Sequence, residues 1–251
     1  MYLKYCDGSS QTGDVDAPVL VDNATIYYRG HRILRAVTAF LSTATLADAT
    51  DVVISGCSAG GLSTYLHADE WTEALPTARV SALPDSGFFL DFNETGVGYT
   101  YGGLMREIVS VMNSTLSARC VAANAADPAA CIFAETVAVT LATPTFALQG
   151  KYDSWQLSGG DAGIPLNDTA RVNAWGAMLS ERIGSTLLAQ PQHGAFLDSC
   201  LHHCGGFDSF IVDEFTQATA HAAWYAGDVR RLYNQTQSYP CQECCGATRR
   251  R

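Results

Sequence analysis

The sequence predicts one α/β domain over residues 1–251, with a mostly parallel sheet and helices on both faces. Short apolar, β-branched runs alternate with longer segments of helical period, which is typical of that architecture. The chain has 251 residues, of which 47% are apolar and 16% charged, enough for one substantial core. No repeat, low-complexity tract or composition shift divides it.

The expected elements follow from these local patterns. The stretch 1–6 reads as a strand and is followed by a loop of Gly, Ser and Asp. Residues 33–46 have apolar side chains at helical spacing, and 51–55 form a β-branched, buried strand before a helix over 59–75. Further strands are expected at 80–83, 144–149 and 185–190, and further helices at 170–183 and 210–232.

The charge balance limits the partners. The formal net charge is -10, and Lys4 and Lys151 are the only lysines. Nucleic acid is therefore excluded as a partner, because neutralising phosphates needs clustered Lys and Arg. No apolar run approaches the roughly 20 residues that a bilayer crossing requires, so no membrane segment is expected. An acidic polymer is neither favoured nor excluded by charge.

Asparagine and cysteine usage indicate a secreted, glycosylated and disulfide-bonded protein. Five of the seven asparagines lie in N-x-S/T sequons, against roughly one in eight by chance. These are Asn23, Asn93, Asn113, Asn167 and Asn234. Nine cysteines without zinc spacing favour disulfides, and Cys120 with Cys131 is a reasonable pair. The polar C-terminal cluster Cys241-x-x-Cys244-Cys245 reads as a structural staple.

The front of the chain does not fit a secreted protein. The opening Met-Tyr-Leu-Lys-Tyr-Cys has no basic region followed by an apolar one, so it is not a signal peptide. The odd number of cysteines also leaves one without a partner. We therefore expect sequence to be missing before residue 1.

The sharpest chemical signal is a nucleophile motif. Gly56-Cys57-Ser58-Ala59-Gly60 satisfies G-x-S-x-G, between an expected strand and an expected helix. Such a turn is so tight that glycines must flank the serine, and it lifts the hydroxyl above the sheet. The N–H of Ala59 at the helix N-terminus can donate to an oxyanion. Ser58 is thus the predicted nucleophile.

A nucleophilic serine needs a base and an acid, which in this fold follow in the order Ser, acid, His. Asp153 and Asp85 each follow an expected strand, and position favours Asp153 only slightly. Three histidines follow the last expected strand, and sequence order does not choose among them. They are His193, His202 and His203. His67, His31 and His221 lie on or beside expected helices, where packing or solvated roles are the simpler interpretation.

At these residues the chain resembles the pectin acetylesterase and Notum family. The matching segments recur in one order along nearly the whole chain and contain several rare residue types. They are 5–9 with 12–14, 28–30, 55–61, 85–91, 152–156, 199–204 and the terminal cysteine cluster.

The resemblance implies an α/β-hydrolase-like fold with a Ser, Asp, His triad. Carried over residue by residue, the nucleophile is Ser58, the acid is Asp153 and the base is His203, the histidine before Cys204. The family's oxyanion hole uses the amide after the nucleophile, here Ala59, and a Gly-Gly-Gly-Trp-Cys loop that has no counterpart in this sequence. The strands that carry this loop in the family are therefore expected to be lacking, which would leave a gap beside the strand at 51–55.

The resemblance further implies ester hydrolysis without a metal or cofactor. The expected substrate is acetylated cell-wall polysaccharide such as pectin. Trp155, Gln156 and Asp85 are candidates for substrate contacts or for bracing the site, and packing is an equal alternative for Trp155. The rival functions are a Notum-like lipid carboxylesterase acting on an acylated protein, and an inactive family member with a binding role.

Overall fold

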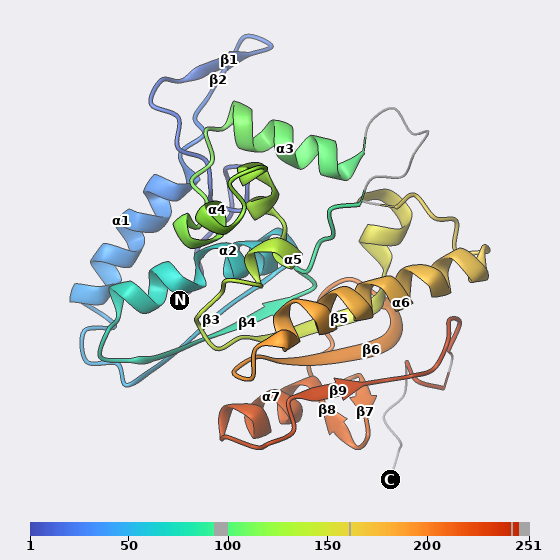
Figure 1. Cartoon of the computed structure of the whole chain (residues 1–251). Helices are drawn as coiled ribbons and strands as arrows, with labels where there is room; N and C mark the ends of the chain where they lie inside the picture. Colours follow the sequence, from blue (N-terminus) through green and yellow to red (C-terminus); the bar gives the residue numbers. More distant parts are fainter. Residues whose placement is uncertain (93–99, 161, 242, 246–251) are drawn as a thin grey trace.

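The computed structural model describes residues 1–92, 100–160, 162–241 and 243–245 (Figure 1). Its strands are β1 (Val19–Val21), β2 (Ala24–Ile26), β3 (Asp51–Cys57), β4 (Arg79–Asp85), β5 (Phe146–Asp153), β6 (Gly194–His202), β7 (Ile211–Val212), β8 (Phe215–Thr216) and β9 (Leu232–Asn234). Its α-helices are α1 (Gly30–Thr43), α2 (Ala59–Ala74), α3 (Tyr101–Val111), α4 (Ala118–Ala123), α5 (Ala134–Val137), α6 (Thr169–Ser185) and α7 (Gln217–Tyr225). Short 3₁₀ or π turns are η1 (Pro128–Ile132), η2 (Gln156–Gly160) and η3 (Leu187–Ala189).

The centre is a five-stranded sheet in the order β3-β4-β5-β6-β9, and every neighbouring pair is parallel. Every residue of β5 is buried, whereas exposed and half-buried positions alternate along β3 because it lies at the edge. All strands of a parallel sheet end at the same side, so the residues after β3, β5 and β6 gather there. The sequence order alone had predicted this α/β architecture.

Helices cover both faces of the sheet, as predicted (Figure 1). One face carries α2, α5 and α6 over the larger core, in which Trp175 and Tyr65 are among the largest fully buried side chains. The opposite face carries α7 and the β7–β8 hairpin over a smaller cluster that includes Phe146 and Tyr233. The sheet is therefore the middle layer of three.

The expected strand at 1–6 is wrong. These residues pair with no strand. Most of them instead line a groove of about 750 Å³ along the free edge of β3, together with the start of α2 and Leu34 and Leu41 of α1. A strand forms only where its backbone finds a ladder partner, and the groove separates this segment from β3.

Two other expectations near the C-terminus also need correction. The apolar run at 185–190 is the end of α6 followed by η3, and the strand begins later, at Gly194. The helix expected over 210–232 is only α7, flanked by β7, β8 and β9. Thr216 and Thr219 form a reciprocal capping box that starts α7, and Gly227, at φ 94°, follows its end.

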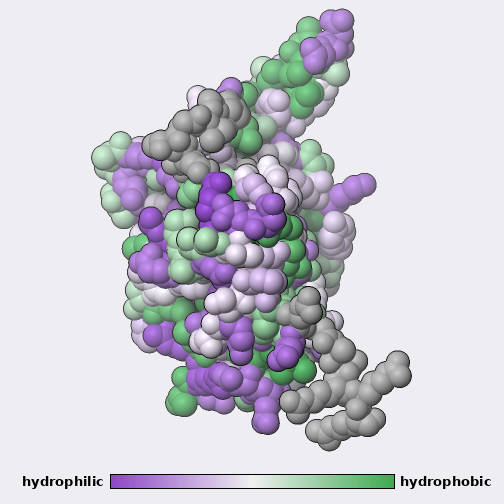
Figure 2. Space-filling view, turned by 90° about the vertical axis from the view of Figure 1, so that its right-hand side faces the viewer, coloured by the Kyte–Doolittle hydropathy of each residue, from purple (hydrophilic) through white to green (hydrophobic). Residues whose placement is uncertain are grey.

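The β1–β2 hairpin projects from the body at the top of Figure 1. The space-filling view shows hydrophobic colour on this projection, where Leu20 and Val21 are 70% and 39% exposed (Figure 2). Asn23, one of the sequon asparagines, lies exposed at its tip. Among the described residues, no helix has the length and apolarity to cross a bilayer.

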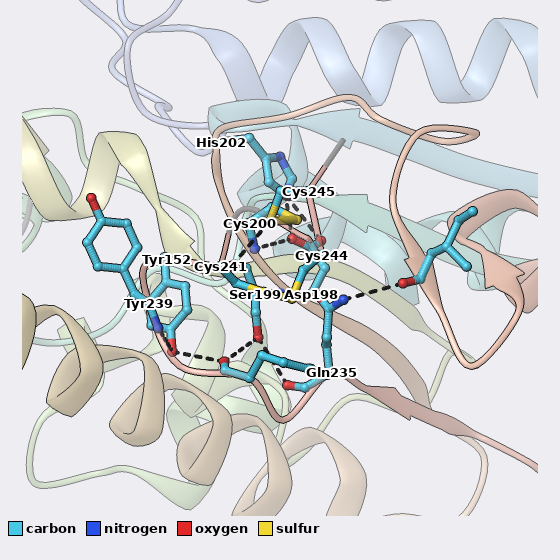
Figure 3. The surroundings of a disulfide bond; sticks show 12 residues. Tyr152, Asp198, Ser199, Cys200, His202, Gln235, Tyr239, Cys241, Cys244 and Cys245 are labelled. Atoms are coloured by element: carbon cyan, nitrogen blue, oxygen red, sulfur yellow. Dashed lines mark hydrogen bonds and ion pairs between the residues drawn. A yellow bond between two sulfur atoms is a disulfide. The ribbon is translucent and has the colours of Figure 1, made fainter. Parts of the chain in front are cut away.

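The C-terminal segment is fastened to β6 (Figure 3). Cys200 of β6 forms a disulfide with Cys245, and Cys241 forms one with Cys244. Beside them the Ser199 hydroxyl donates to the carbonyl oxygens of Gln235 and Gln237. The terminal cysteines thus act as the predicted staple, and the predicted Cys120–Cys131 disulfide is also present. Cys6 is unpaired.

His193 is a buried structural residue at the start of β6. The N–H of Thr145 donates to its Nδ1 at 3.2 Å, and its Nε2 lies 3.2 Å from the carbonyl oxygen of Leu141, to which it donates. Protonation of Nδ1 would place a hydrogen against the Thr145 N–H. Burial lowers the pKa of His193 to about 4 and outweighs the opposing hydrogen bond to Leu141.

This depressed pKa predicts a loss of stability in mild acid. The unfolded chain binds a proton on His193 near pH 6.5, whereas the folded chain does so only near pH 4. The free energy of unfolding should therefore fall by up to roughly 3 kcal/mol as the pH drops from 6.5 to 4. Urea titrations at stepped pH measure it. A His193→Asn variant should be less stable at pH 7 with a shallower slope, and an unchanged slope would contradict the assignment.

Candidate active site

Ser58 occupies a strained turn between β3 and α2. Its φ of 59° and ψ of -122° lie outside the regions that residues with a side chain normally adopt. Its N–H donates to the carbonyl oxygen of Asp85 at 2.9 Å, which fixes the turn to the end of β4. A Cβ on Gly56 would lie 2.4 Å from the carbonyl oxygen of Gly60, so the turn requires glycine there. The strand, elbow and helix follow one another as predicted.

A second glycine contact holds the first turn of α2 against the loop after β4. A Cβ on Gly87 would lie 2.2 Å from the backbone carbon of Gly61, and a Cβ on Gly61 would lie 2.5 Å from the carbonyl oxygen of Asp85. Only glycine at both positions allows this approach. Ala59 is the first residue of α2, where N–H groups have no partner within the helix.

Asp153 and His203 come together at the ends of neighbouring strands. Asp153 ends β5 and lies opposite His202 of β6 in the ladder, so His203 directly follows the paired position. A register shift between Gly150 and Tyr152 changes which residues face each other at the ends of the two strands. Nδ1 of His203 donates to the Asp153 carboxylate, with both oxygens 2.9 Å away.

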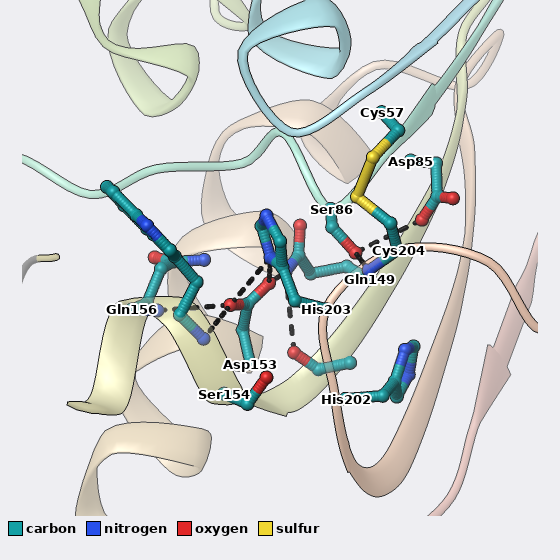
Figure 4. Close-up of polar contacts among 12 residues, drawn as sticks. Cys57, Asp85, Ser86, Gln149, Asp153, Ser154, Gln156, His202, His203 and Cys204 are labelled. Atoms are coloured by element: carbon teal, nitrogen blue, oxygen red, sulfur yellow. Dashed lines mark hydrogen bonds and ion pairs between the residues drawn. A yellow bond between two sulfur atoms is a disulfide. The ribbon is translucent and has the colours of Figure 1, made fainter. Parts of the chain in front are cut away.

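The Asp153 carboxylate is fully buried and held by further donors (Figure 4). Its Oδ1 accepts the N–H groups of Trp155 and Gln156, at 3.0 and 3.1 Å. Its Oδ2 accepts the side-chain amide of Gln149 at 3.3 Å. These bonds fix the orientation of the carboxylate. The carboxylate therefore keeps the hydrogen of His203 on Nδ1 and leaves Nε2 with a lone pair.

Asp85, the alternative acid, braces the loop instead. Its carboxylate accepts the Gly205 N–H at 2.8 Å and the Ser86 hydroxyl at 3.1 Å. Burial raises the pKa of Asp85, which these two hydrogen bonds only partly offset. Figure 4 shows it on the far side of the Cys57–Cys204 bridge from Asp153. Of the two carboxylates, Asp153 is the one that contacts His203.

A disulfide links the nucleophile elbow to the histidine loop (Figure 4). Cys57 precedes Ser58, Cys204 follows His203, and the two cysteines are bonded with their Cα atoms 5.7 Å apart. The Ser86 hydroxyl also accepts the Cys204 N–H at 2.9 Å. His203 Nε2 is buried and has no hydrogen-bond partner within the described part of the chain. The disulfide therefore brings the two loops together, and no Ser58–His203 hydrogen bond is formed.

The other histidines are committed elsewhere. His202 Nε2 lies 3.0 Å from Asp198, and its ring packs on Phe210. This carboxylate outweighs the effect of burial and raises the pKa of His202. His193 lies at the opposite end of β6 from His203. His67 is buried in α2. Within the described residues, the one three-member cluster of metal-ligating types is away from the elbow, on α1 and α2.

Aromatic side chains form a wall beside His203. Trp155 stacks near the imidazole with ring centroids 6.0 Å apart, and it meets Phe89 and Tyr101 edge to face. It is 40% exposed, so part of the indole is available to a substrate. Gln156 is fully buried, and its N–H holds Asp153. Burial therefore favours the bracing role for Gln156 and for Asp85.

Sequence reasoning missed several residues that shape this site. Gln149 ties Asp153 to the Phe88 N–H, which it accepts at 3.1 Å. Phe89 was noted only as part of a matching segment, although it lies beside Trp155. The pairing of Cys57 with Cys204 was also unforeseen. Two signals were available in the sequence. Gln149 is a polar residue at the end of an apolar run, and Cys57 and Cys204 lie directly beside Ser58 and His203.

Comparisons with known proteins agree with this architecture. The pectinacetylesterase family profile matches residues 1–246. Pectin acetylesterases 11 and 7 of Arabidopsis thaliana are each 31% identical, covering 81% of this chain and 56% of their own length. Human palmitoleoyl-protein carboxylesterase NOTUM is 26% identical, over 81% of this chain and 43% of its own. The chain thus spans a little over half the length of the first two relatives.

A solved structure shows the same fold. The Wnt deacylase Notum from Drosophila superposes with a TM-score of 0.80 at 22% identity, covering 97% of this chain and 73% of that one. This similarity supports the α/β-hydrolase-like fold predicted for the chain. The family itself is shown by the profile match over residues 1–246. The chain belongs to the pectinacetylesterase family.

Proposed function

We propose that the protein is a serine esterase that removes acetyl groups from a cell-wall polysaccharide such as pectin, with Ser58, His203 and Asp153 as its triad. The observation that carries the proposal is the Asp153–His203 pair, joined to the Ser58 elbow through the Cys57–Cys204 disulfide. The names of the Arabidopsis relatives support the same acyl group and polymer.

In the proposed reaction His203 Nε2 takes the proton of the Ser58 hydroxyl as the oxygen attacks the acetyl carbonyl carbon. Asp153 keeps the other imidazole nitrogen protonated and stabilises the imidazolium. Nε2 then gives its proton to the departing sugar oxygen, leaving acetyl-Ser58. Water, deprotonated by the same nitrogen, attacks the acetyl carbon. The ester bond to Ser58 then breaks, acetate is released, and Nε2 returns the proton to the Ser58 oxygen. His203 Nε2 therefore carries the proton in both half-reactions. This role is supported by the free lone pair on Nε2, which has no hydrogen-bond partner among the described residues.

The Ala59 N–H is the proposed donor to the oxyanion. It lies at the N-terminus of α2, where the helix dipole favours negative charge. A donor of this kind contributes about 10²–10³ in rate. The unusual φ of Ser58 supports the arrangement, because the strained turn presents the hydroxyl and the next N–H on the same side.

A lipid carboxylesterase of the Notum type is the second candidate. The partly exposed indole of Trp155 beside His203 favours it, since an acyl chain could lie against this ring. The same ring suits a sugar face equally well, and the higher identity to the plant enzymes keeps polysaccharide deacetylation first.

Secretion and glycosylation are part of the proposal. Of the sequon asparagines, Asn23, Asn113 and Asn167 are exposed, and Asn93 lies outside the described residues. Four disulfides also suit an oxidising compartment. Both observations support an extracellular location.

The first test compares substrates. The protein should release acetate from acetylated pectin faster than it cleaves a long-chain acyl ester, and Ser58→Ala should lower the rate at least ~10⁴-fold. A fluorophosphonate probe should label the wild type and not Ser58→Ala. A preference for the long acyl chain would favour the lipid esterase, and absence of labelling in the folded protein would favour an inactive family member.

The second test separates the two carboxylates. Asp153→Asn should reduce kcat about 10⁴-fold, because an amide facing Nδ1 no longer enforces the required tautomer. Asp85→Asn is the matched control: its side-chain oxygen can still accept the Gly205 N–H, so kcat should stay within about 10-fold. Equal losses in the two variants, measured on folded protein by initial rates, would refute Asp153 as the acid.

The third test concerns the Cys57–Cys204 disulfide. Replacing both cysteines by Ser should cost roughly 3–5 kcal/mol of stability and should also reduce kcat, since the elbow and the histidine loop lose their covalent link. Replacing Cys120 and Cys131 by Ser removes a disulfide of the large core. That control should lose stability but keep kcat. If kcat per folded molecule stayed unchanged in both, the disulfide would have no positioning role.

A further inference from the structure

A cluster away from the triad contains His31, His67 and Glu70. His31 lies at the start of α1, and the other two lie three residues apart on one face of α2. Nε2 of His31 and Nδ1 of His67 are each 3.0 Å from a different oxygen of Glu70. The two rings stack with centroids 5.8 Å apart. Both histidines are buried, whereas the Glu70 side chain is 38% exposed.

The hydrogen-bond directions in this cluster conflict without a bound cation or an extra proton. Nε2 of His67 lies 3.1 Å from the carbonyl oxygen of Ser10, which can only accept, so Nε2 carries the hydrogen. In a neutral imidazole Nδ1 then has a lone pair, and it faces a carboxylate oxygen. Two acceptors at this distance repel each other unless a positive species lies between them.

The carbonyl oxygen that faces Nε2 of His67 belongs to a hydrogen-bonded turn. The turn that presents the Ser10 carbonyl is itself fixed, since the Asp7 carboxylate accepts the N–H groups of Ser9, Gln11 and Gly13. His67 is therefore held in place by a rigid backbone acceptor.

From this geometry we propose that His31, His67 and Glu70 bind a divalent transition-metal ion of the zinc class. Two imidazoles and one carboxylate, with a water at the exposed side, form a known zinc donor set. A ligating histidine commonly donates its other N–H to a backbone carbonyl, as His67 does to Ser10. The ion would join α1, α2 and the turn at Ser10.

The donor spacing fits such an ion after a small movement. The three donor atoms lie within 4.8 Å of one another. Two atoms that each lie about 2.1 Å from one zinc ion are at most about 4.2 Å apart, so the donors must close by at most about 0.6 Å. Mg²⁺ prefers six oxygen ligands and does not suit this set.

The test is Zn²⁺ titration of the metal-stripped protein in a Cys6→Ser background, which removes the unpaired thiol. Calorimetry should give one ion per chain, and Zn²⁺ but not Mg²⁺ should raise the melting temperature. Glu70→Gln and His31→Gln should each weaken binding at least ~10-fold. Glu73→Gln is the matched control, because Glu73 is an exposed carboxylate one turn further along α2.

Cobalt gives an independent readout on the unmutated cluster, so misfolding of a variant cannot decide the question. Co²⁺ bound by imidazole and carboxylate should show visible d–d bands without a sulfur charge-transfer band. The proposal is overturned if the protein binds no ion, if all variants bind Zn²⁺ equally, or if a sulfur band appears.

Discussion

The close packing of the first turn of α2 against the ends of β3 and β4 is the constraint on which the site depends. Gly61 and Gly87 meet backbone to backbone, and the Ser58 N–H is bonded to the Asp85 carbonyl oxygen. Since Asp85 also holds the Gly205 N–H, the same contact reaches the loop after β6. Any side chain larger than hydrogen at the two glycines would displace the elbow, the helix start and that loop together.

Local apolar patterns were sufficient to predict the elements with one continuous buried face. The strand β3, the helix α2 and the helix α6 all lie near their expected positions. The strand β5 was only half predicted, because its second half contains buried Lys151 and Asp153. Partners distant in sequence, among them the carbonyl of Gln235 for Lys151, satisfy these polar groups. No local pattern carries that information.

The residues of the candidate site also differ in how far local sequence patterns predict them. Ser58 was found from its own neighbours, because the elbow is a local structure. Asp153 and His203 were chosen by family resemblance, since chain order leaves Asp85 and two other histidines in competition. The physical reason for their meeting is the β5–β6 register, which sets Asp153 opposite His202. This register depends on pairing between strand residues about fifty positions apart, so no local sequence pattern predicts it.

The Cys57–Cys204 bond also makes a covalent ring, because its two cysteines are separated by 147 positions. Ser58, Asp153 and His203 all lie inside that ring. A single proteolytic cut in any loop between them opens the ring but leaves both fragments joined through sulfur. In an environment rich in proteases and free of reductant, the serine and histidine would stay in one molecule after such a cut. Durability against limited proteolysis is therefore inherent in the same bond that sets the two loops side by side.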